Sequence, residues 1–282
     1  MTIVGPKETS FVYGEAYQRE QVEKHRLRRE NHWKPRVALA HKLIDDYVLP
    51  RLGPPGPGGV TVLDVGCSIG TMAIEMAARG FKSYGVDFDA AALRIARELS
   101  AEEGVSVDFF QGDVAAWRPE VGRSLDIALC FDIFEHLHDD ELGALLQTIR
   151  RHLSDRGALV FHTFPLQFDY IFFSRDIIGW PLAPFTWMPG NMFERVVRAY
   201  ASALDAGLLL VTGQTYKQRI TKISHCNPTT TARLTEILER AGYSIRYMQS
   251  SQLYAFKPHV QRRFEKHPIA HRNLYGVAVP RG

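Results

Sequence analysis

The regular alternation of short apolar segments with amphipathic segments between residues 60 and 163 constrains the fold more than any other feature of this sequence. The apolar segments predict strands at 61–65, 83–87, 105–111, 125–131 and 158–163. The segments between them carry apolar residues at the i, i+3, i+4 spacing of a helix, for example Ile69, Met72 and Met76. Strands that alternate with helices form a parallel sheet covered on both faces, and such sheets bind ligands where the strands end.

The flanking segments divide the chain into four predicted parts. Residues 1–59 are predicted to be an N-terminal helical segment that ends in a linker. The linker, at 50–59, is rich in proline and glycine and is predicted to have neither helix nor strand. Residues 60–163 form the ligand-binding domain. Residues 164–225, dense in aromatic side chains, are predicted to be an insertion over the strand ends. Residues 226–282 supply a helix and two strands, near 244–254 and 273–279, that complete the domain.

Composition excludes several classes of protein. The 282 residues include 34 lysines and arginines against 31 aspartates and glutamates, and this net charge of +3 is too small to indicate a nucleic-acid partner. Three cysteines without a C-x-x-C pair indicate neither a zinc ribbon nor a disulfide framework. No apolar run reaches the roughly 18 residues of a membrane span, and the first residues lack the pattern of a secretion signal. We therefore expect a cytoplasmic protein.

The turn after the first predicted strand is the most informative stretch. Gly66 and Gly70 stand between a buried strand and a helix, where glycines let a ligand approach the backbone. Dinucleotide enzymes have the fingerprint G-x-G-x-x-G here, but Ser68 and Thr71 replace its second and third glycines. The loop therefore serves a pyrophosphate less well, which disfavours a nicotinamide-dependent oxidoreductase. A tight turn without any ligand is the plainer alternative.

Acidic residues follow the next two strands. Asp87 ends the second strand, 87 − 70 = 17 residues after Gly70, where a carboxylate can accept two hydrogen bonds from a ribose diol. Phe88 is placed to lie against a purine ring, and Asp113 is placed to accept a hydrogen bond from an exocyclic amine. The alternatives are a helix cap for Asp87 and ordinary packing for Phe88.

Taken together, these motifs resemble class I S-adenosylmethionine-dependent methyltransferases, over residues 60–164 and the last strands. The matching features are the acidic-x-Gly loop from Asp64 to Gly70, the acid Asp87, the pair Gly112-Asp113, the strand from Asp126, and the Leu-x-x-x-Gly-x-Leu turn from Leu153. The resemblance implies an α/β fold with a Rossmann-like, mostly parallel sheet of seven strands and helices on both faces. The last strand would be antiparallel.

The resemblance also implies S-adenosyl-L-methionine as cofactor and S-adenosyl-L-homocysteine as product. The methionine part would be held by the loop of Asp64, Gly66, Cys67, Ser68 and Gly70, with Phe131 lining the same side. Asp87 would bind the ribose, Phe88 would flank the adenine, and Asp113 and Val114 would contact the adenine edge.

A hydroxyl acceptor needs a general base, because an alcohol is a poor nucleophile while protonated. Histidine is the usual side chain for this task, and His136, His162 and His225 fall near the predicted mouth of the site. His136 is the first choice, since Glu135-His136-Leu137 resembles a stretch of ubiquinone-biosynthesis-type O-methyltransferases. A purely structural role is the alternative for each of the three.

A metal site is the competing interpretation of the same region. Asp132, Glu135 and His136, with His225, resemble the magnesium or manganese site of some small-RNA 2′-O-methyltransferases and quinone-pathway enzymes. Those enzymes have glutamate where this chain has the shorter Asp132. We therefore predict no metal ligands, and a divalent metal is the less favoured interpretation.

The acceptor is the least constrained prediction. Trp180 and Trp187 belong to an aromatic segment that either walls a pocket for a small molecule or forms a second small core. A basic stretch at 257–272 is interpreted as a solvated face rather than a nucleic-acid site. We predict methylation of a hydroxyl, or second of an amine, on a small molecule such as a specialised metabolite or sugar. The alternatives are a metal-dependent RNA 2′-O-methyltransferase, a NAD-dependent oxidoreductase and a non-catalytic cofactor-binding module.

Overall fold

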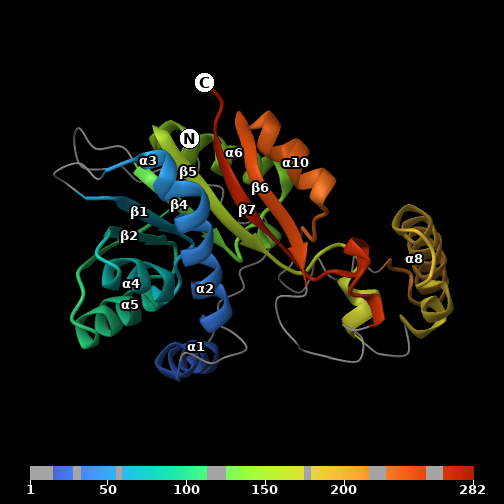
Figure 1. Ribbon diagram of the computed structural model, residues 1–282. Helices are drawn as coiled ribbons and strands as arrows, with labels where there is room; N and C mark the ends of the chain where they lie inside the picture. The colour runs from blue at the N-terminus through green and yellow to red at the C-terminus, as the bar shows by residue number, and fades with distance from the viewer. Residues whose placement is uncertain are drawn as a thin grey trace.

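The computed structural model describes residues 15–27, 33–54, 59–112, 125–174, 179–215, 227–251 and 263–282. Its centre is a seven-stranded sheet with the order β3-β2-β1-β4-β5-β7-β6 (Figure 1). The strands are β1 (Thr61–Val65), β2 (Lys82–Asp87), β3 (Val107–Gln111), β4 (Leu125–Phe131), β5 (Leu153–Thr163), β6 (Tyr243–Ser251) and β7 (Asn273–Pro280). The pairs from β3 to β5 are parallel, and β7 runs antiparallel to both β5 and β6. The predicted fold class is confirmed, including its antiparallel last strand.

Helices cover both faces of the sheet, as two apolar clusters show. On one face, α2 (Trp33–Leu43), the π-helical turn η1 (Ile44–Val48) and α4 (Thr71–Ala78) pack on β1, β4, β5 and β7. On the other face lie α6 (Asp139–His152) and α10 (Thr231–Arg240). The helix α5 (Ala90–Glu102) packs beside α4, and α1 (Glu15–Leu27) lies beneath both in Figure 1. The central strands are thus buried on both sides, which explains their continuous apolar runs.

Two local features mark where helices begin and end on this face of the sheet. Asp89 is the N-cap of α5, and its carboxylate accepts from the backbone N–H groups of Ala91 and Ala92 at 2.8 and 3.2 Å. Gly80 follows α4 with φ +91°, a left-handed conformation that glycine adopts without steric cost.

Two boundaries differ from the predictions. The chain at 153–157 was predicted to be a turn, but β5 already begins at Leu153, which pairs with Leu125. Gly157 permits this, because a Cβ there would lie 2.9 Å from the backbone oxygen of Leu125. The predicted linker was also wrong at its start, since α3 (Leu49–Leu52) continues the helix through Pro50. Proline is tolerated in the first turn of a helix, and Gly53 at φ +73° ends this one.

The aromatic segment after β5 forms a separate apolar cluster. It comprises η3 (Tyr170–Ser174), η4 (Trp180–Phe185) and α8 (Gly190–Thr212), which stands away from the sheet in Figure 1. Phe168, Phe172 and Phe193 are buried there against Phe264. Packing therefore accounts for most of these aromatics, while Trp180 and Trp187 are 61% and 77% exposed.

Among the described residues, none of the helices has the length and apolar character needed to cross a membrane.

Candidate functional site

The chain reverses direction across the sheet between β1 and β4. From β1 it moves outward to β2 and β3, then returns to place β4 on the other side of β1. The carboxyl ends of β1 and β4 therefore diverge into turns that leave in opposite directions, and this switch point is where ligands of open α/β sheets bind. Of the predicted site residues, Gly66, Cys67, Ser68 and Gly70 lie in the turn after β1, and His136 lies after β4.

The glycine loop after β1 is pressed onto its neighbours. The N–H of Gly66 donates to the backbone oxygen of Val86 at 2.9 Å. At φ +70°, a Cβ on Gly66 would lie 2.6 Å from the Cδ1 of Ile133, in the turn after β4. A Cβ on Gly70, at φ +79°, would lie 2.7 Å from the Phe109 ring. Glycine is required at both positions by conformation and by space.

Asp87, at the end of β2, braces this loop. Its Oδ2 accepts from the N–H of Ser68 at 2.8 Å, and its Oδ1 accepts from the N–H of Asp89 at 2.9 Å. Burial raises the pKa of this carboxyl. A carboxylate offers about four acceptor positions, so Asp87 keeps capacity for the hydroxyls of a ligand. The ring of Phe88, beside it, is 64% exposed.

Asp64, at the end of β1, is a buried acid that titrates near neutrality. It is 4% exposed, and its Oδ2 accepts from the N–H of Ala73 at 3.2 Å. Burial raises its pKa to about 7, and the nearby charge of Asp87 acts in the same direction. An acid in this position gains from a cationic ligand group that stabilises its ionised form.

The N-terminal helix α1 closes over the glycine loop through residues that the sequence did not single out. The Nδ1 of His25 lies 3.0 Å from the Oγ1 of Thr71, at the start of α4, and its Nε2 lies 2.9 Å from Glu103. The Nε2 of Gln18 donates to Asp89 at 3.3 Å. His25 has no exposed surface, so α1 is docked on the loop by a buried polar contact.

At the end of β4, a series of buried polar contacts links charged side chains. Asp132 adopts φ +56°, and its Oδ1 and Oδ2 lie 2.5 Å from the Nδ1 of His162 and the Nε of Arg36. The Nε2 of His162 lies 3.0 Å from the Oδ1 of Asn273 on β7. Burial alone would raise the pKa of Asp132, but Arg36 and His162 together hold it below the ordinary value.

The three histidines expected to supply a base have different surroundings. His162 is fully buried, stacks on Phe131 at 5.7 Å and has a protein partner at each ring nitrogen, a geometry that suits positioning rather than proton transfer. His136 is half-buried in η2 (Phe134–His136), directly after β4. His225 lies outside the described residues, as do Asp113 and Val114.

Glu135 is a buried acid beside this series of contacts. Its Oε2 accepts from the Oγ1 of Thr163 at 2.8 Å, while its Oε1 has no hydrogen-bond partner among the described residues. Burial, and then the charge of Asp132, raise its pKa well above the ordinary value. In the described part of the chain, no group of three or more His, Cys, Asp or Glu side chains is arranged to hold a metal ion. Cys67 and Cys130 are buried free thiols whose pKa burial raises.

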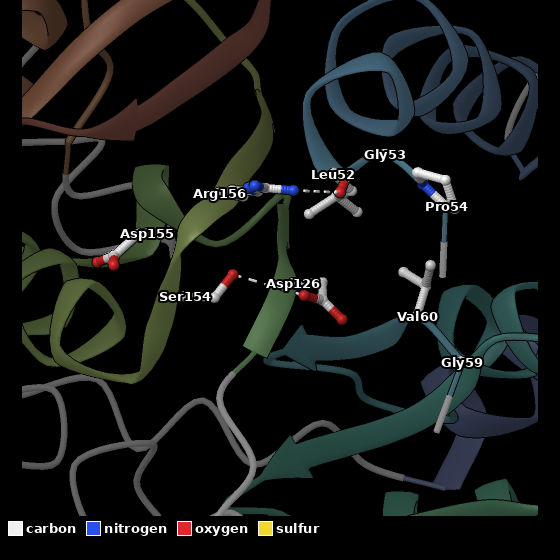
Figure 2. Close-up of a pocket in the computed structure, with 9 residues that line it drawn as sticks. All are labelled: Leu52, Gly53, Pro54, Gly59, Val60, Asp126, Ser154, Asp155 and Arg156. Atoms are coloured by element: carbon white, nitrogen blue, oxygen red, sulfur yellow. Dashed lines mark hydrogen bonds between the residues drawn. The ribbon is translucent and has the colours of Figure 1, made fainter. Parts of the chain in front are cut away.

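A cavity of about 310 Å³ lies at the opposite edge of the sheet, where β1, β4 and β5 begin (Figure 2). Figure 2 shows Ser154 bonded to Asp126 and Arg156 bonded to the backbone of Leu52, so these polar side chains of the lining bond to one another or to the backbone. It is separated from the site residues by the length of the strands.

Comparisons with known proteins concern the same region. A family model described as a methyltransferase domain matches residues 62–157. The ubiquinone biosynthesis O-methyltransferase of Sodalis glossinidius is 33% identical over 118 residues, covering 42% of this chain and 46% of that protein. The enzyme of the same name from Pseudomonas paraeruginosa is 38% identical over 84 residues, covering 30% of this chain and 36% of that protein. The chain spans less than half the length of these curated relatives.

A solved structure extends the likeness to the whole fold. An S-adenosylmethionine-dependent methyltransferase from Clostridium acetobutylicum aligns over 95% of this chain and 99% of its own, with a TM-score of 0.56. At 10% identity, this likeness concerns the fold alone.

Proposed function

We propose that the chain, whose residues 62–157 match the methyltransferase domain model, is an S-adenosylmethionine-dependent methyltransferase acting on a hydroxyl group of a small molecule. The observation that carries this proposal is the set of groups gathered where β1 and β2 end. A buried acid, Asp64, stands beside the glycine loop, and a braced acid, Asp87, stands beside an exposed ring, Phe88. Two acids and an aromatic ring match the three kinds of group in the cofactor, which are an amino group, ribose hydroxyls and a flat adenine.

The cofactor would be distributed over these groups. Asp64 would receive the amino group of the methionine part, because a buried acid near its pKa ionises readily beside a cation. Asp87 would accept from the ribose hydroxyls, and the exposed Phe88 would lie against the adenine. Bound there, the cofactor supplies an electrophilic methyl group on a sulfonium, so the protein's task is alignment of the acceptor.

His136 is the proposed base for a hydroxyl acceptor. It lies in the turn after β4, beside the switch point, and it is half-buried rather than enclosed like His162. Its neighbour Glu135 is held by Thr163, which gives the turn a rigid anchor. The relatives' name, O-methyltransferase, supports oxygen as the accepting atom, with nitrogen as the second choice.

The acceptor is proposed to be a small, flat molecule bound near the aromatic insertion. Trp180 and Trp187 are exposed although most aromatics around them are buried. Aromatic surface of this kind suits an apolar or amphipathic ligand, such as a specialised metabolite or a sugar derivative. Asp113, Val114 and His225 keep their proposed roles from the family resemblance.

Calorimetry with S-adenosyl-L-homocysteine and with NAD tests the cofactor. We expect binding of the first and none of the second, and the reverse result would overturn the proposal. Transfer of a labelled methyl group from S-adenosyl-L-methionine to a panel of phenols, benzenediols and amines tests the reaction. Cofactor binding without transfer to any of them, in the presence or absence of Mg²⁺, would indicate a binding module instead.

The base is tested by His136→Ala. We expect kcat to fall roughly 10²- to 10⁴-fold with unchanged cofactor affinity. The matched control is His138→Asn, two residues away. His138 is the N-cap of α6, and asparagine is also a good N-cap residue. Equal rates in His136→Ala and the control would remove His136 from this role.

A further inference from the structure

Arg36 is a buried cation delivered to the site by the N-terminal helices. It lies on α2, which runs across one face of the sheet in Figure 1, and it is 1% exposed. Its Nε donates to the Oδ2 of Asp132, 96 residues further along the chain. Its guanidinium also lies over the Phe164 ring, 5.3 Å from the centroid. Burying an arginine costs free energy unless its charge is paired, so the buried position of Arg36 depends on its ion pair with Asp132.

Asp132 is held in a conformation that aspartate rarely adopts. Its φ of +56° lies in the left-handed region, where a non-glycine residue needs support from its surroundings. Arg36 holds one carboxylate oxygen and His162 holds the other. His162 is in turn held by Asn273, so one chain of polar contacts joins α2, β4, β5 and β7.

The turn that follows Asp132 carries the candidate base. His136 comes four residues after Asp132. Ile133, between them, packs so closely on Gly66 that a Cβ added there would lie 2.6 Å from its Cδ1. A shift of Asp132 would therefore move both the glycine loop and η2. Displacements of about 1 Å can change a catalytic rate by roughly a hundredfold.

The same contacts disfavour a divalent cation at Asp132, because Arg36 already places a positive charge against one carboxylate oxygen. Both oxygens already face cationic or N–H groups at 2.5 Å, and Glu135 is enclosed beside Thr163. A hard cation needs several oxygen ligands with free lone pairs. The donor set that the sequence brings together in one turn therefore does not match a magnesium or manganese site.

We propose that Arg36 is a positioning residue whose positive charge holds Asp132 and the turn after it, in place of a divalent metal ion. Removing the guanidinium should then do two things. It should release one oxygen of Asp132 for metal binding, and it should loosen the turn that carries His136. The first effect is independent of the proposed function, whereas the second rests on it.

The first effect is measured with Mn²⁺ itself, by electron paramagnetic resonance of the free ion. We expect the wild-type chain and Arg36→Lys to lack a Mn²⁺ site that depends on Asp132. Arg36→Met should bind Mn²⁺ at least tenfold more tightly than the wild type, and Arg36→Met with Asp132→Asn should lose this gain. A wild-type site lost in Asp132→Asn, or no gain in a folded Arg36→Met, would overturn the proposal.

The second effect is measured as the separate changes in kcat and in cofactor affinity. We expect Arg36→Met to lower kcat roughly tenfold to a hundredfold with S-adenosyl-L-homocysteine affinity unchanged, and Arg36→Lys to restore part of it. The matched control is Lys42→Met on the same helix, whose exposed side chain pairs with Asp46, four residues later. If Arg36→Met does not fold, Arg36→Lys decides, and full loss of kcat with a new Mn²⁺ site in that variant would contradict the proposal.

The two proposals fail in different ways. If the wild type neither binds S-adenosyl-L-homocysteine nor transfers a methyl group, the proposed function is wrong, and the Mn²⁺ result still judges Arg36. If the wild type is active and all Arg36 variants match it, the role of Arg36 is wrong and the function stands.

Discussion

The two sides of the switch point are built by different means. On the side of β1 and β2, backbone conformation and short-range contacts form the site, as the loop from Gly66 to Gly70 and its brace on Asp87 show. On the side of β4 and β5, side chains from distant elements meet, as Arg36, Asp132 and Asn273 show. The first side suits a ligand of fixed chemistry. The second depends on elements that are far apart in the chain, so it can change when any one of them changes.

Asp64→Asn should break the first side most severely. We expect the affinity for S-adenosyl-L-homocysteine to fall at least a hundredfold, because the buried charge that would receive its amino group is gone. In the wild type, affinity should fall as the pH drops below about 7, where the carboxyl becomes protonated. Calorimetry between pH 5.5 and 8.5 measures both effects. A flat pH profile in the wild type would remove Asp64 from this role.

The same substitution should stabilise the chain without cofactor. The pKa of Asp64 is about 7 in the folded state against 3.8 ordinarily, so its protonation favours folding below pH 3.8, and this advantage is lost as the pH rises to about 7. At pH 8, Asp64→Asn should therefore increase the free energy of unfolding by a few kcal/mol, on the order of magnitude that the pKa difference gives, and so raise Tm. At pH 4 it should change Tm little. Thermal unfolding at the two pH values measures this difference. Equal Tm values at pH 8 would show that the buried charge has no cost.

Gly70→Ala tests how tightly the loop is packed. The added Cβ would lie 2.7 Å from the Phe109 ring and 3.0 Å from the Cβ of Ala96, besides adopting φ +79°. We expect a loss of about 2–4 kcal/mol in the free energy of unfolding. Gly104→Ala is the matched control, since its φ is +68° but nothing lies within 4 Å, and it should lose about 1–2 kcal/mol. Equal losses in urea unfolding would mean that packing contributes nothing at Gly70.

Trp180 and Trp187 should give the smallest effect on stability and a selective one on the acceptor. Both are exposed, so replacing them with serine should change the free energy of unfolding by less than about 0.5 kcal/mol. KM for the acceptor should rise, while the affinity for S-adenosyl-L-homocysteine stays the same. Unchanged KM values for both variants would place the acceptor elsewhere than beside the insertion.

The same contrast explains what could be predicted from the sequence. The strands, the cap Asp89 and the positive-φ glycines were predictable because each depends on residues next to it in the chain. Arg36, His25 and Asn273 were not, because their partners lie 96, 46 and 111 residues away. His162 was noticed only as a histidine near a strand end, and its enclosure by Asp132 and Asn273 depends on strand order. Charged residues on a helix are normally solvated, so Arg36 carried no local signal.

The place of β7 in the sheet has a consequence for synthesis of the chain. β7 is made after β6, yet it lies between β5 and β6 and provides every strand pairing of β6 in the described sheet. While the chain emerges from a ribosome, the edge of β5 is therefore unpaired, and β6 lacks the strand with which it pairs in the finished sheet. Such edges promote association between unfinished chains until they are covered. Since Asn273 stands at the start of β7, the polar contacts of His162 are completed at the same late step that closes this edge.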